Sequence, residues 1–187
     1  MATTNFNCGT RFIYKGATFV VQEQILPGID GDDPDSDPIG QAVDLYEAGN
    51  AEGSTRLLHK CLEEDLRVLD AYAHLGNWTF AGGSRRLFVE RAQRNYEAGV
   101  AIAELSLGSA FNGVLEWGRI DNRPFLRCLH GLGIYRWALG NLKGASEIFE
   151  RMLWLNPSDN QGARFCLANV GAGTKYEADF PLSGTVV

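Results

Sequence analysis

Apolar and polar residues follow a helical period over most of the chain, from Ile39 to about Gly171. Short breaks rich in Gly, Asn and Pro separate the apolar stripes, because these residues end helices or begin turns. The pattern predicts seven helices, at residues 39–48, 51–64, 68–80, 84–106, 124–139, 142–155 and 159–170. We therefore expect a mainly α fold.

The ends of the chain have a different pattern. Residues 10–26 contain two runs of β-branched and aromatic residues on either side of a glycine, which predicts a short hairpin or an extended arm. The acidic segment that follows is rich in Pro and Gly and cannot pack a core. We divide the chain into an N-terminal β arm and acidic linker (1–38), a helical domain (39–171) and a C-terminal tail (172–187).

Two of the helix breaks share one motif. Gly49-Asn50 is followed by the small residue Ser54, and Gly140-Asn141 is followed by the small residue Ala145. A Gly-Asn pair ends one helix, and a small residue in the next helix allows the two helices to pack closely. The motif therefore predicts helical hairpins.

The later hairpin resembles the tetratricopeptide repeat. It contains Leu132-Gly133, then Ala145-x-x-x-Phe149, and then Pro157, in the order that this family has. The family usually has an aromatic residue three positions after this glycine, where this chain has Arg136. The resemblance implies a right-handed superhelix of antiparallel helix pairs, each of which buries its apolar face against a neighbour.

Weaker forms of the repeat precede this hairpin. Residues 71–77 carry a Leu-Gly pair, and 92–96 carry an Ala-x-x-x-Tyr partner about four residues late, whereas 39–64 is more degenerate. The resemblance covers about two-thirds of the chain. The alternative is an irregular helical bundle with accidental Leu-Gly spacing. Residues 107–122 form an insertion, which is either a loop folded onto the core or a lid over a groove.

The resemblance also implies a binding surface. In the tetratricopeptide family the first helix of each repeat lines a concave groove in which partner peptides dock. The implied partner-binding residues are His74, Asn77, Phe80, Arg123, Arg127, His130, Trp137 and Arg164. The family's carboxylate clamp is not reproduced, because Ala73 and Gly131 occupy two of its positions. Some of the basic residues would receive an acidic segment through charge-assisted hydrogen bonds, or else they are only structural or solvated.

Charge argues against a general nucleic-acid binder. The net charge is −6 and the isoelectric point is about 5.1, whereas affinity for a duplex depends on Lys and Arg that neutralise phosphates. Four arginines lie close together at positions 85, 86, 91 and 94, with Glu90 and Glu97 within one turn of Arg91 and Arg94. We interpret them as a salt-bridged helix surface, with RNA binding as the alternative.

No catalytic or metal-binding pattern is present in the sequence. It has no nucleophile elbow, no phosphate-binding loop and no clustered Cys and His, and its four cysteines are scattered. We expect a non-catalytic adaptor without a cofactor that binds a peptide or protein partner. The alternative is a regulatory or substrate-capturing subunit of a larger enzyme assembly.

The N-terminal residues bear on location and self-association. Residues 1–10 are polar and lack the apolar run of a secretory signal, and no stretch approaches the ~20 apolar residues of a membrane helix. We therefore expect a cytoplasmic protein. An unpaired strand edge in the arm would also allow pairing with a second copy.

Overall fold

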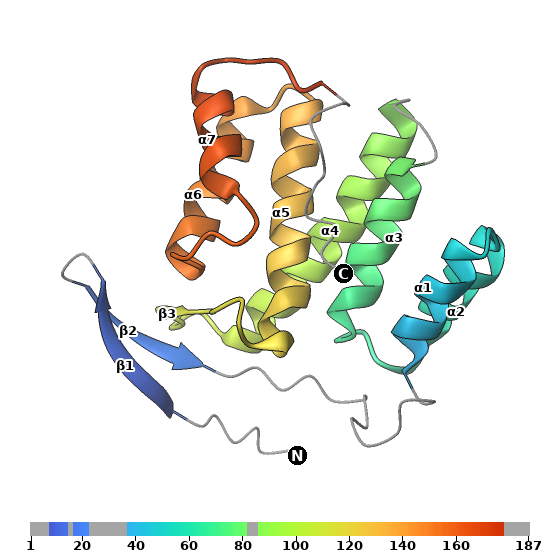
Figure 1. Cartoon of the computed structure of the whole chain (residues 1–187), viewed down its shortest axis with the longest axis horizontal. Coiled ribbons are helices and arrows are strands. Elements are labelled where there is room, and N and C mark those ends of the chain that lie inside the picture. Colours follow the sequence, from blue (N-terminus) through green and yellow to red (C-terminus); the bar gives the residue numbers. More distant parts are fainter. Residues whose placement is uncertain (1–7, 15–16, 23–36, 82–85, 178–187) are drawn as a thin grey trace.

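The computed structural model describes the backbone of residues 8–14, 17–22, 37–81 and 86–177, and the side chains of residues 37–79 and 88–177. These residues are mainly helical (Figure 1). The helices are α1 (Pro38–Glu47), α2 (Ala51–Glu64), α3 (Leu69–Ala81), α4 (Arg86–Leu107), α5 (Arg123–Ala138), α6 (Leu142–Leu155) and α7 (Ala163–Gly171). The other elements are strands β1 (Cys8–Tyr14), β2 (Ala17–Gln22) and β3 (Gly113–Val114) and the short 3-10 helix η2 (Ile120–Asn122).

Consecutive helices pack in pairs. α1 packs with α2, α3 with α4 and α5 with α6, while α7 packs against α6 (Figure 1). α5 also contacts both α3 and α4 and is buried along most of its length. The third helix pair therefore closes over the second one, and the shared core lies around α5.

The repeated Gly-Asn motif has the same structure at both of its sites. Gly49 and Gly140 have φ values of +84° and +80°, in the left-handed region that favours glycine. Asn50 Oδ1 then accepts a hydrogen bond from the backbone N–H of Gly53 at 2.9 Å, and Asn141 Oδ1 accepts one from that of Gly144 at 3.0 Å. Each motif thus ends one helix and caps the next.

Each of the seven predicted helices is present, and the largest difference is the start of α7. The sequence pattern predicts that this helix begins at residue 159, but it begins at Ala163. Asp159 and Gly162 have φ values of +50° and +72°, which turn the chain before the helix. The Asp159 carboxylate accepts a hydrogen bond from the Ala163 N–H at 2.6 Å, so it still serves the N-terminus of the helix.

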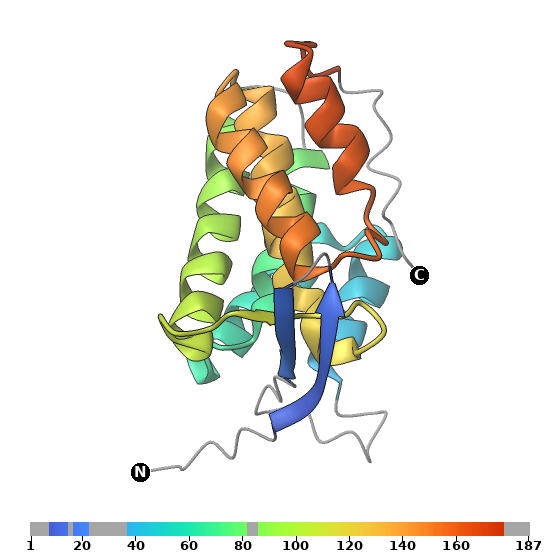
Figure 2. The same cartoon turned by 90° about the vertical axis from the view of Figure 1, so that its left-hand side faces the viewer.

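The insertion at 107–122 folds back onto the core. Leu115 is fully buried, Trp117 is buried beside it, and the Leu115 N–H donates to the Leu155 carbonyl at 2.7 Å. Within the insertion, β3 pairs in parallel with β2, which pairs in antiparallel fashion with β1, at one end of the helices (Figures 1 and 2). The interpretation of this segment as a loop folded onto the core is confirmed.

An aromatic residue of α4, Tyr96, is packed between two glycines of neighbouring helices. Tyr96 of α4 is 1% exposed, and its ring fills the space beside Gly76 of α3 and Gly131 of α5. A Cβ atom at these glycines would lie 2.4 Å and 2.2 Å from the ring. The Tyr96 hydroxyl donates to Asn77 Oδ1. Small residues at these two positions are therefore required for three helices to meet.

This packing predicts that Gly131→Ala destabilises the fold by about 1–3 kcal/mol, because the new methyl group overlaps a ring that cannot move. Gly171→Ala is the matched control, since it also adds a methyl group to a helix but meets no atom within 4 Å. Urea unfolding followed by circular dichroism measures both free energies of unfolding. Equal stability of the two variants would contradict the packing of Tyr96 against Gly131.

Candidate functional site

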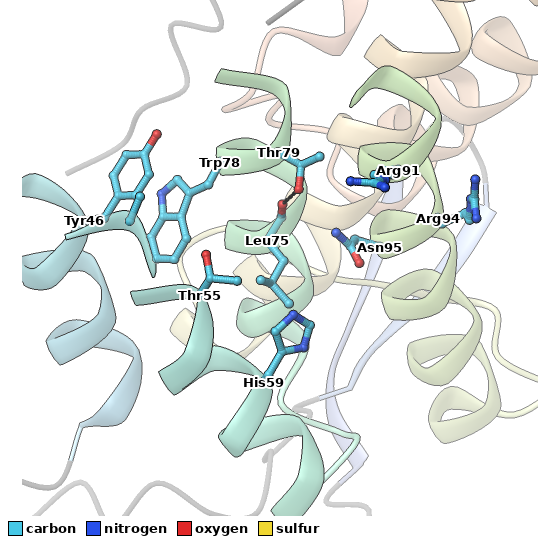
Figure 3. A pocket seen from close by; sticks show the side chains of 10 residues that line it. Tyr46, Thr55, His59, Leu75, Trp78, Thr79, Arg91, Arg94 and Asn95 are labelled. Carbon is cyan, nitrogen blue, oxygen red and sulfur yellow. Dashed lines mark hydrogen bonds between the residues drawn. The ribbon is translucent and has the colours of Figure 1, made fainter. Parts of the chain in front are cut away.

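A cleft of about 490 Å³ lies between α2, α3 and α4 (Figure 3). The first helix pair forms one wall, and the second pair forms the base and the other wall. Its lining residues are Tyr46, Ala51, Thr55, His59, Leu75, Trp78, Thr79, Arg91, Arg94 and Asn95. A volume of this size is in the range of sites that hold a small ligand or a few side chains.

One end of the cleft is aromatic. The rings of Tyr46 and Trp78 are stacked, with centroids 4.5 Å apart and planes 7° apart. The His74 ring lies 5.3 Å from the Trp78 ring on α3. Stacked rings expose a flat apolar surface and lose little conformational freedom when another side chain packs against them. This pair also connects the first helix pair to the second.

The opposite wall is positively charged. Arg91 and Arg94 are exposed on α4. Figure 3 shows Arg91 extending toward α3 and Arg94 at the outer edge of α4, at the rim of the cleft. The sequence interpretation that pairs these arginines with Glu90 and Glu97 is wrong: neither arginine forms an ion pair or hydrogen bond with any residue whose side chain is described. Glu97 instead lies 4.0 Å from Arg136 of α5 and accepts a hydrogen bond from Gln93. Arg85 and Arg86 are outside the described side chains.

Further polar groups line the space between these two ends. Thr55 and His59 come from successive turns of α2, and Asn95 comes from α4 (Figure 3). The Thr79 hydroxyl donates to the Leu75 carbonyl at 2.6 Å, which leaves its oxygen available as an acceptor. No Asp or Glu is among the lining residues that the structure describes. The cleft therefore offers an apolar shelf beside hydrogen-bond donors and two cations.

Two of the sequence-predicted groove residues are paired within the fold. The Arg127 Nη1 donates to both carboxylate oxygens of Asp70, at 2.9 and 3.0 Å. The Arg123 Nε donates to the Trp117 carbonyl at 3.0 Å, and both guanidinium groups lie over the Trp117 ring, 5.3 and 5.9 Å from its centroid. The structure thus brings Arg123 and Arg127 together, where they join α5 to α3 and to the insertion.

His74 and His130 are held in their neutral forms by the protein. Burial is the main cause that lowers the pKa of His74, against an opposing effect of Asp70. Burial also lowers the pKa of His130 to about 4, although the charge of Asp159 acts in the other direction. His130 Nε2 is buried and lacks a hydrogen-bond partner among the described residues. Neither histidine is suited to carry a positive charge toward a ligand at neutral pH.

The remaining groove residues are dispersed. Trp137 is buried, and its Nε1–H donates to the Thr174 carbonyl at 2.7 Å, while Tyr176 packs against its ring. Asn77 accepts from Tyr96, and the Arg164 guanidinium donates to Asp159 at 2.7 Å. The side chain of Phe80 lies outside the described residues.

The cleft was missed by reasoning from the sequence. Two local signals were available: Thr55 and His59 are four residues apart on α2, and Arg91 and Arg94 are three apart on α4. Residues at these spacings share a helix face. The sequence does not show that these two faces open toward the same space, because that depends on how α2 and α4 sit around α3.

The buried histidine predicts a pH dependence of stability. The pKa of His130 is about 4 in the folded protein and about 6.5 in the unfolded chain, so the unfolded chain binds the proton first as the pH falls. The free energy of unfolding therefore falls between pH 6.5 and 4, by roughly 3 kcal/mol from this residue. His130→Gln should flatten this part of the profile in urea unfolding. An identical slope in both proteins would contradict the assignment.

Within the helices that the structure describes, none is long and apolar enough to cross a membrane. The side chains described here contain no group of three or more His, Cys, Asp or Glu that could hold a metal ion. No protein-family model matches the sequence, and no curated protein matches it.

Proposed function

We propose that this protein is a non-catalytic interaction module that holds a segment of another protein in the cleft between α2, α3 and α4. The observation that carries the proposal is the combination of a stacked aromatic pair with two arginines that have no described ion-pair partner. Aromatic residues and Arg are the residue types that dominate binding energy at protein interfaces. A concave site on helices also provides a rigid platform for an extended segment.

The proposal includes a tetratricopeptide-like superhelix as the scaffold. Gly76 lies beside Tyr96, and Gly133 lies beside Phe149, so the glycine of one helix receives the large aromatic residue of the next in two successive pairs. A recurring contact of this kind supports a repeat architecture over an irregular bundle. Within it, β1 and β2 would form an N-terminal arm. Repeat arrays present extended surfaces that serve as scaffolds for partners.

The cleft is a better docking place than the predicted groove. Arg123, Arg127 and Arg164 already hold partners inside the fold, and Trp137 is covered by residues 174–176. A partner would have to break these contacts before it could use the same groups, and leaving a buried polar group unpaired is costly. In the cleft, Arg91 and Arg94 hold no partner among the described residues, so a ligand could reach them without breaking a contact that the structure describes.

We also propose a reducing, cytoplasmic location. Cys61, Cys128 and Cys166 are free thiols and are buried. Burial raises the pKa of the Cys166 thiol to about 11, so it stays protonated and unreactive at neutral pH. Such cysteines serve as small apolar residues of the core, as is usual for proteins of reducing compartments.

The test is affinity capture from a nuclease-treated native lysate, with captured proteins quantified by mass spectrometry. Arg91→Glu combined with Arg94→Glu should reduce capture of the partner at least about tenfold, because each substitution replaces an attractive charge with a repulsive one. The matched control is Arg56→Glu combined with Lys60→Glu on α2. It makes the same charge change at exposed residues that do not line the cleft.

The outcomes separate the alternatives. Loss of the partner with the cleft variant, but not with the control, supports the module. Capture that occurs in an untreated lysate but not in the nuclease-treated one would overturn it in favour of nucleic-acid binding. Equal capture by all three proteins would also overturn it, since the binding surface would then lie outside the cleft.

A further inference from the structure

Resting on the proposed function, we infer that the segment bound in the cleft is an acidic stretch of a partner protein with an aromatic or large apolar side chain between carboxylates. The apolar side chain would pack on Trp78 and Leu75, and the carboxylates would lie at Arg91 and Arg94. This surface is distinct from the groove on α3, α5 and α7 that the repeat resemblance implies.

The charge of the cleft is opposite to that of the protein. The whole chain carries a net charge of −6, yet the described residues that line the cleft include two arginines and no carboxylate. Helix surfaces elsewhere on the described chain balance their cations locally, as Arg56 does with Glu52 and Lys143 does with Glu147. Arg91 and Arg94 are not balanced in this way by a described residue, so they form a local site for an anion.

The chemistry of arginine favours carboxylates as the partner groups. A guanidinium group presents a planar fork of donors that matches a carboxylate through two parallel hydrogen bonds. Asn95, also of α4, lies between the arginines and α3 and adds an amide that can donate to the same anion (Figure 3). His59 and Thr55 supply further hydrogen-bonding groups on the α2 wall.

The apolar end requires a side chain beside the carboxylates. The Tyr46 and Trp78 rings cover one face of each other, and the His74 ring lies 5.3 Å from Trp78. The rest of the half-buried Trp78 ring lines the cleft beside Leu75, which is 4% exposed. A purely acidic segment would leave this surface against water. A segment with one aromatic residue would bury it, and contacts between aromatic rings are worth more than their area alone.

The size and overall charge exclude the other anionic macromolecules. A space of about 490 Å³ takes a few side chains, whereas a nucleic-acid strand needs a basic track along several nucleotides. The two arginines that are described at the cleft, on a protein of charge −6, do not provide such a track. An acidic peptide needs cations only beside its few carboxylates, and the two arginines supply them.

The experiment is a selection of random peptides displayed on phage against the wild-type protein, with the cleft variant Arg91→Glu/Arg94→Glu and the control Arg56→Glu/Lys60→Glu in parallel. We expect wild type and control to enrich peptides in which Asp and Glu flank an aromatic residue. The cleft variant should not enrich them. The most enriched peptide, labelled with fluorescein, should lose at least about tenfold in affinity for the cleft variant in fluorescence anisotropy.

A second pair of measurements checks the recognition chemistry. The affinity of the enriched peptide should fall with added salt, because exposed charges are screened, and should fall again when its aromatic residue is replaced by Ala. Arg91→Lys combined with Arg94→Lys keeps the charge and should weaken binding less than the Glu variant does, since only the bidentate geometry is lost.

The inference is overturned if the enriched peptides are neutral or basic, if none is enriched, or if the cleft variant selects the same peptides as wild type. These results are separate from the test of the module itself. A native partner that is captured through the cleft, but whose bound segment is not acidic, would remove this inference and leave the interaction module in place.

Discussion

The position of Tyr96 between two glycines is the constraint on which the other features depend. Its ring occupies the space that a side chain at Gly76 or Gly131 would need, so α3, α4 and α5 meet at one buried ring. The ring also fixes the rotation of α4 about its axis. Arg94 and Asn95, which immediately precede Tyr96, are thereby held at the wall of the cleft. A core contact thus decides which polar side chains of α4 line the cleft.

Several polar side chains of the described residues join one helix pair to another or to the C-terminal segment. Asp70 and Arg127 join the second helix pair to the third, and Trp137 is joined to the C-terminal segment at Thr174. These contacts lie on the surface where a repeat protein would bind a peptide. The proposed docking place lies instead on the side of α2 and α4, where Arg91 and Arg94 have no ion-pair partner among the described residues. One type of helical scaffold can present different surfaces.

The helices were predictable because their signals are local. Asn50 and Asn141 cap the helices that follow them through hydrogen bonds to backbone N–H groups three residues later. Such caps can be recognised in a sequence because few residue types form them. The start of α7 was not predictable, since it depends on the left-handed conformation of Asp159. The cleft was not predictable either, because Glu97 lies beside Arg136 of α5 and Arg91 and Arg94 have no ion-pair partner in the part of the chain that the structure describes. Contacts between helices thus decide which charged residues pair, whatever their spacing along one helix.

The pairing of β2 with β3 has a consequence for how the protein loses its structure. Arrays of helix pairs usually have contacts only between neighbours, so a terminal pair can unravel while the others persist. Here Val20 is paired with Gly113, and the segment after β3 is bonded to the end of α6 through Leu115 and Leu155. The first strands of the chain are thus bonded to the segment before α5 and, through it, to the end of α6. Because this closure is non-local, we expect these parts to unfold together and the chain to fold more slowly than one with contacts only between neighbouring helices.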